Sequence, residues 1–171
     1  ISWLYYADRI VQLPLGIFII SITTIMLTVL SKEKVTKINK IEKINTSFLL
    51  ILSVTFLSLV GLLVISDLIV EVLFRRGRFG YGDAKATSDA IYMYALGLPA
   101  FGLIKLFSTI FFSRQNTKIP FYISFISMIL NIILLFLSVE KLGHQGIALS
   151  LSITSWFNAL TLYFLLYYNR Y

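Results

Sequence analysis

The sequence contains no cysteine, and only one of its 171 residues is a histidine. The absence of cysteine excludes disulfides, thiolate metal sites and cysteine nucleophiles. The single histidine, His144, has no paired carboxylates near it in the sequence, so it does not predict a metal site. No Ser–His–acid set, phosphate-binding glycine loop or nucleotide motif is visible. We therefore expect a protein that is not an enzyme and needs no cofactor.

Charged residues are also scarce, at 13% of the chain, whereas hydrophobic residues make up 58%. The mean hydropathy is +0.86. A soluble fold of this length could not hide so much apolar surface, so the chain is expected in a bilayer. The apolar runs are long and unbroken rather than alternating, which predicts helices instead of barrel strands. The expected fold is an all-α, polytopic transmembrane helix bundle.

Five apolar segments reach the length of about 20 residues that is needed to cross a hydrocarbon core. They cover approximately residues 1–30, 46–74, 90–112, 119–139 and 147–168, within a single membrane domain over 1–171. The chain has no charged region followed by a short apolar core and a cleavage site, so no signal peptide is predicted. It starts inside an apolar segment without a methionine, and we expect further chain to precede it.

Basic residues, which give a net charge of +7, lie mostly between the apolar segments. The segment 31–45 carries five lysines, with Val35 and isoleucines at every third position, which suggests a short amphipathic interfacial helix. Lysine and arginine concentrate on the cytoplasmic side of membrane proteins. We therefore expect the lysine loop 31–45, the turn 113–118 and the C-terminus in the cytoplasm. No basic groove with interleaved aromatic residues is present, so no nucleic-acid partner is expected.

Asp8 and Arg9 lie inside the first apolar segment, where charges are costly and usually mark a pathway or a water-filled cavity. Helical spacing places a set of polar or small residues on one face of this segment: Tyr5, Asp8, Arg9, Gln12, Gly16 and Thr23. One interpretation is that Arg9 lines a cavity and binds phosphate oxygens through its planar fork of donors. In the alternatives, Arg9 pairs with Asp8 or another acid, or extends to the outer interface.

Two further features of the apolar segments bear on function. Pro14 interrupts the hydrogen bonding of the first helix and predicts a bend near Gly16, although Pro and Gly are also common in membrane helices. Lys105 is a second intramembrane charge, which either helps to hold a diphosphate or extends toward the turn 113–118.

Residues 5–16, 73–79 and 95–120 (YYADRIVQLPLG, LFRRGRF and the stretch from ALGLPAF to FSRQNTKIP) together resemble the MurJ/MviN family of lipid II flippases. Residues 5–16 match the family's YYADR-x-x-QLPLG helix, residues 73–79 its LF-x-RG-x-F loop, and residues 95–120 its ALGLPAF…K…FY-x-RQDT-x-TP helix and turn. They occur in the family's order across about the first two-thirds of the chain. The sequence departs from the pattern at Thr28, where the family has LP-x-LS, and at Phe112, Asn116 and Ile119 in the turn.

The resemblance implies a two-lobe fold of six helices each, plus two trailing helices, with this chain as most of the second lobe. It also implies alternating-access transport of lipid II, an undecaprenyl-diphosphate-linked peptidoglycan precursor, across the bacterial inner membrane for cell-wall biogenesis and cell shape. The implied partners are lipid II, membrane lipids and the first lobe of the same protein. Arg9 would match the family's cavity arginine. The candidate substrate-binding residues are Arg9, Lys105, Asp8, Gln12 and Tyr5, and the candidate hinge residues are Pro14 and Gly16.

Two other function classes stay open on the sequence alone. A related polysaccharide or multidrug exporter would share the architecture, but a cation exporter should carry acidic cavity residues, whereas here Asp8 is accompanied by Arg9 and Lys105. A non-transporting scaffold of cell-wall assembly would place Arg9 and Lys105 against partner helices or lipid headgroups rather than water.

Overall fold

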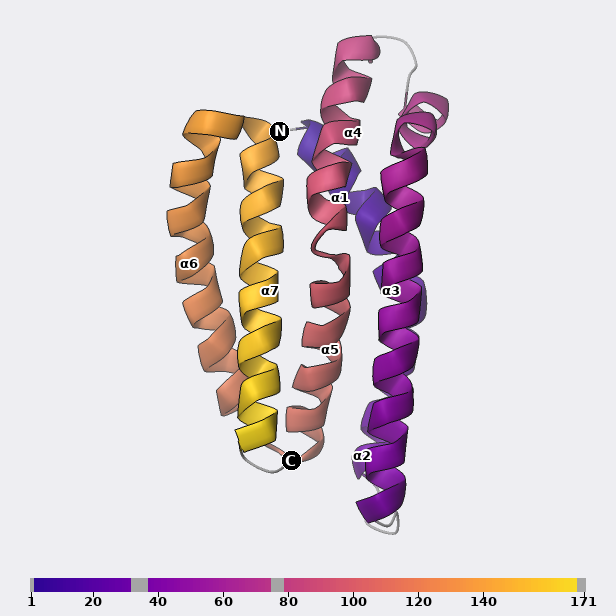
Figure 1. The fold of residues 1–171 in the computed structure, drawn as a ribbon, viewed down its shortest axis with the longest axis vertical. Coiled ribbons are helices and arrows are strands. Elements are labelled where there is room, and N and C mark those ends of the chain that lie inside the picture. Colours follow the sequence, from indigo (N-terminus) through magenta and orange to yellow (C-terminus); the bar gives the residue numbers. More distant parts are fainter. Residues whose placement is uncertain (1, 32–36, 75–78, 169–171) are drawn as a thin grey trace.

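The computed structural model describes residues 2–31, 37–74 and 79–168, and every regular element in these ranges is a helix (Figure 1). The elements are α1 (Ser2–Pro14), η1 (Leu15–Ile19), α2 (Ile20–Ser31), α3 (Lys37–Phe74), α4 (Tyr81–Ala95), α5 (Leu98–Ser113), α6 (Lys118–Leu142) and α7 (His144–Tyr168). Four helical stretches are long and apolar enough to cross a membrane, and α4 and α5 together form a fifth, bent by 45°. The predicted all-α bundle of about five spans is confirmed.

The first span contains a π-helical turn directly after its proline. Pro14 has no backbone N–H, and η1 begins at the next residue. The N–H of Ile20 donates to the carbonyl of Leu15, five residues earlier, which is the hydrogen bond of a π-turn. The predicted disturbance near Gly16 is thus a widened turn within a continuous helical span.

The structure differs from the expected segment bounds at α3 and α4. Helix α3 begins at Lys37, so the described part of the lysine segment forms its first turns rather than a separate interfacial helix; residues 32–36 lie outside the described ranges. Helix α4 begins at Tyr81, inside a stretch expected to be a loop, because the carboxylate of Asp83 accepts a 3.0 Å hydrogen bond from the N–H of Gly80 and caps the helix. The third expected span is therefore longer than 90–112, and it is broken at Leu96–Gly97.

Helix α5 lies at the centre of the bundle and packs against α2, α3 and α7. Gly102 allows a close approach to α3, since a Cβ at this position would lie 2.9 Å from the Cγ2 atoms of both Ile51 and Thr55. At the other side of the bundle, Gly146 of α7 lies against the backbone of Ser138, which brings α6 onto α7. Small residues at such contacts let membrane helices pack closely.

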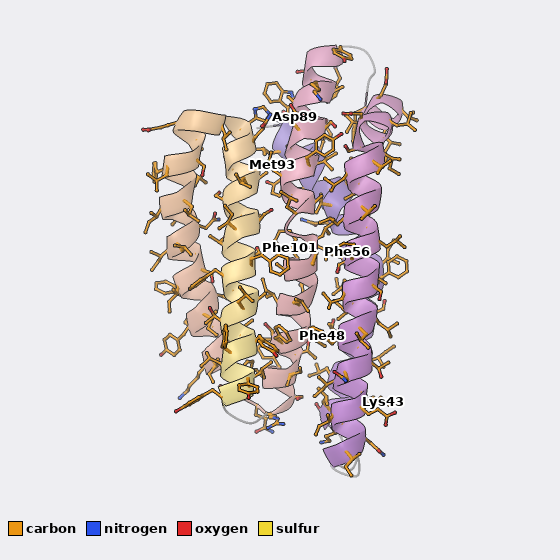
Figure 2. The ribbon with its side chains drawn as sticks, viewed as in Figure 1. Lys43, Phe48, Phe56, Asp89, Met93 and Phe101 are labelled. Carbon is orange, nitrogen blue, oxygen red and sulfur yellow. The ribbon has the colours of Figure 1, made fainter. Side chains whose placement is uncertain are left out.

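The connections between the helices gather at the two ends of the bundle. One end carries the close of α2, the start of α3, the α5–α6 turn and the C-terminus, and Lys43 lies near it (Figures 1 and 2). The other end carries the N-terminus, the start of α4 and the α6–α7 junction, with Asp89 close by. The described parts of the segments that the charge count assigned to one side of the membrane, namely the start of α3, the α5–α6 turn and the end of α7, thus meet at one end. Which side of the membrane this end faces stays a prediction.

Candidate functional site

A cleft of about 420 Å³ is formed mainly by the first span and α5. This volume lies in the range of small-molecule sites. Its lining includes polar and charged side chains from two spans as well as apolar ones: Asp8, Val11, Gln12, Leu15, Gly16, Ile20, Tyr94, Phe101, Ile104, Lys105 and Leu151. Four of the residues that the sequence singled out therefore share one cleft: Asp8, Gln12, Gly16 and Lys105.

The wall contributed by α1 is a row of residues spaced one turn apart. Gln12 Nε2 donates to Asp8 Oδ2 at 2.5 Å, which holds the carboxylate against its own helix. Gly16 follows one turn later, and a Cβ there would meet no heavy atom within 4 Å. Its lack of a side chain therefore leaves open space in the cleft.

Lys105 provides the cation of the cleft. Its side chain is exposed, and within residues 2–31, 37–74 and 79–168 its ammonium forms neither a hydrogen bond nor an ion pair. An unoccupied ammonium group offers three donors to an anion. The structure thus brings Lys105 to the same cleft as Asp8 and Gln12, which lie about 95 residues earlier in the chain.

Arg9 and Tyr5 lie beside the cleft and do not line it. The Nη2 atom of Arg9 donates to the Tyr5 hydroxyl at 3.1 Å, and its guanidinium carbon lies 5.0 Å from the centre of the Tyr5 ring. This is a cation–π arrangement combined with a hydrogen bond, and both side chains are exposed on the surface of this chain. Among the described residues no acid forms an ion pair with Arg9, and Asp8 bonds Gln12 instead.

The polar face predicted for the first span does not continue to its end. Thr23 is buried in the core, and its hydroxyl donates to the carbonyl of Ile19 at 2.8 Å. The π-turn η1 explains the change, because a turn with one extra residue rotates all later residues around the helix axis. The stripe that starts at Asp8 therefore leaves the cleft after Ile20.

Several cleft residues were not anticipated from the sequence. Phe101 precedes Lys105 by one helical turn, and this spacing could have indicated it. Tyr94 and Leu151 belong to α4 and α7 and join the cleft only through packing between helices. No local pattern marks them.

Comparisons with known proteins agree on one family. The sequence model of the family described as lipid II flippase MurJ matches residues 1–170. A curated relative named probable lipid II flippase MurJ, from Rickettsia prowazekii, is 39% identical over 169 residues, which is 95% of this chain and 32% of the relative. A relative of the same name from Vibrio cholerae is 37% identical over 166 residues, 95% of this chain and 31% of the relative.

A solved structure supports the same assignment. The structure of a lipid II flippase MurJ in an inward closed conformation matches with a TM-score of 0.89 and 34% sequence identity, over 97% of this chain and 35% of that chain. The chain thus spans about a third of the length of the curated relatives that it matches, 32% for the first.

Proposed function

Because this chain belongs to the lipid II flippase MurJ family, we propose that it forms about a third of a flippase for lipid II, the portion over which its relatives match. The observation that carries the proposal is the cleft within the membrane-spanning helices, where the ammonium of Lys105 has no partner among the described residues. Intramembrane cations of this kind usually mark a substrate pathway.

The proposed mechanism is alternating access, and no covalent bond is broken. Lys105 receives the diphosphate from within the cleft, and Arg9 binds it from the adjacent exposed face of α1. Arg9 would exchange its hydrogen bond with Tyr5 for stronger, charge-assisted bonds to phosphate oxygens. The Asp8–Gln12 pair presents polar atoms to the headgroup beside the diphosphate. The lipid tail stays near the hydrocarbon while the headgroup crosses.

A conformational change needs a place to bend, and the first span provides one. Pro14 and the π-turn η1 lie about two to three turns beyond Asp8, and Gly16 within η1 leaves open space in the cleft. π-Turns are frequent at functional sites, and a proline permits a change in helix direction. We propose that this segment is the hinge. Membrane potential would bias the movement of cleft charges by about 2.3 kcal/mol per charge per 100 mV.

The proposed setting is the inner membrane of a bacterium, with the lysine-rich start of α3 and the C-terminus in the cytoplasm. The start of α3, the α5–α6 turn and the end of α7 meet at one end of the bundle, which supports a common side for them. The other partners are membrane lipids and the further two-thirds of chain that the matched relatives possess, which would close the cavity opposite Arg9.

Replacing Arg9 by alanine and by lysine in the full-length protein tests the proposal. Lysine keeps the charge but loses the planar fork, so we expect flipping to be lost in Arg9→Ala and impaired in Arg9→Lys. Lys43→Ala, which removes an exposed cation on α3 away from the cleft, is the matched control and should retain flipping. Undiminished lipid II translocation by both Arg9 variants would remove this residue from the mechanism.

A second measurement separates a transporter from a scaffold. A cysteine in place of Arg9 should react with a membrane-impermeant thiol reagent if the position faces a water-filled cavity. Protection of this cysteine in the assembled protein would instead favour a partner helix or lipid at the same face.

A further inference from the structure

The break between α4 and α5 lies within a membrane-spanning pair of helices. The N–H of Gly97 donates to the carbonyl of Tyr94 at 2.9 Å, and the N–H of Phe101 donates to the carbonyl of Gly97 at 2.9 Å. Pro99, near the start of α5, has no N–H and leaves the last turn of α4 without one helical donor. Irregular backbone at membrane depth requires hydrogen-bond partners from elsewhere in the protein.

Helix α7 supplies such partners from two residues one turn apart. Ser152 Oγ donates to the carbonyl of Met93 at 2.6 Å, and Trp156 Nε1 donates to the carbonyl of Leu96 at 3.0 Å. Ser152 is almost fully buried, with 2% of its surface exposed. Met93 lies in the last turn of α4 and Leu96 directly follows this helix, so the two donors hold the final turn before the bend. Figure 2 labels Met93.

The same contact extends to the cleft. A Cβ on Gly97 would lie 2.8 Å from Ser152 Oγ and 2.9 Å from Phe101 Cζ, so these three residues pack without a gap. Figure 2 shows Phe101 on the side of α5 toward α7. Phe101 and Lys105, one turn apart on α5, both line the cleft. The direction in which α5 leaves the bend therefore determines where Lys105 lies.

We propose that Ser152 and Trp156 are positioning residues that fix the bend between α4 and α5 and thereby hold Lys105 in the cleft. Both donate to backbone carbonyls, and neither donor contacts the cleft itself. The consequence for transport rests on the proposed function, whereas the consequence for the bend does not.

The bend can be measured directly in the full-length protein. Spin labels on cysteines that replace Gly82 and Phe112, exposed positions near the two ends of the bent pair, report its angle as a distance distribution. The double variant Ser152→Ala/Trp156→Phe loses both donors and keeps an aromatic ring on α7. In this variant we expect the fraction of molecules with an altered distance between the two spin labels to be about tenfold larger than in the unmodified protein, which is equivalent to about 1.4 kcal/mol.

Ser155→Ala is the matched control, because Ser155 is a buried serine of α7 whose hydroxyl donates within its own helix, to Leu151, at 2.7 Å. It should leave the distances unchanged. If the double variant does not fold, Trp156→Phe alone is measured instead. It removes one of the two donors and should also alter the distance between the spin labels. Unchanged distances in the folded variant would overturn the proposal.

Transport measured in parallel keeps the two proposals apart. If the unmodified full-length protein does not move lipid II but the double variant has an altered bend, the proposed flippase function is refuted and the positioning role is supported. If the unmodified protein moves lipid II but the double variant has an unaltered bend, the flippase function is supported and the positioning role is refuted.

Discussion

Replacing Gly102 by alanine is expected to destabilise the contact between α5 and α3. The added Cβ would lie 2.9 Å from Ile51 Cγ2 and 2.9 Å from Thr55 Cγ2. Carbon atoms prefer about 3.5–4.0 Å, so the contact is short by roughly 0.6 Å or more on each side. Both neighbours are fully buried and β-branched, with stiff χ1 angles. Thr55 is further held by a 2.7 Å hydrogen bond from its hydroxyl to the carbonyl of Ile51.

Neither neighbour has an easy alternative rotamer, so the two helices must separate to accept the new methyl group. Overpacking of this kind costs about 1–3 kcal/mol. Adding Thr55→Ser removes one of the two opposing methyl groups and keeps the hydroxyl. The double variant should therefore recover part of the loss, with a coupling of about 0.5–1 kcal/mol between the two positions.

The assay is unfolding of the full-length protein by SDS in mixed micelles, followed by circular dichroism. Gly61→Ala in α3 is the control, because a Cβ there meets no heavy atom within 4 Å. That change should be neutral or stabilising by about 0.5–1 kcal/mol through helix propensity. If Gly102→Ala unfolds like Gly61→Ala, the close approach of α5 to α3 is not a determinant of stability and the reasoning fails.

Two further predictions use other parts of the bundle. Cysteines in place of Gln12 and Lys105 should react with a membrane-impermeant thiol reagent, whereas one in place of Thr23, buried in the core, should not; equal labelling at all three would contradict the split of the polar face by the π-turn. Gly146→Ala places a Cβ 2.6 Å from the carbonyl oxygen of Ser138, and because backbone cannot rotate away, we expect a cost of about 3 kcal/mol in the same SDS unfolding assay. A cost below about 1 kcal/mol would show that α6 moves away from α7 freely.

Much of the fold follows from the sequence, because lipid imposes a simple rule on the backbone. Each long apolar run must form a helix that satisfies its own hydrogen bonds, so hydropathy alone predicted the fold class and the number of spans. The same reasoning located Asp8, Gln12 and Lys105 as unusual polar residues at membrane depth. The spacing of Asp8, Gln12 and Gly16 placed them on one helical face, and the structure shows all three in one cleft.

The bounds of α4 were harder to predict because its start depends on a cap and its end on partners far away in sequence. Asp83 closes the first turn within a stretch that reads as a glycine-rich loop. The break at Leu96–Gly97 is held by Ser152 and Trp156, about 60 residues later in the chain. Hydropathy carries no information on which distant side chain will donate to an interrupted helix.

The sequence by itself determined that this protein lies in a membrane as a helix bundle, and which of its polar residues are exceptional there. Only the tertiary structure decided that Lys105 shares a cleft with Asp8 and Gln12, that Arg9 turns aside toward Tyr5, and that α7 holds the bend in its neighbour. The physical reason is the separation in sequence between the residues that interact. Hydrogen bonds within a helix join residues four or five apart, whereas the faces that meet across a bundle are selected by close packing between segments distant in sequence.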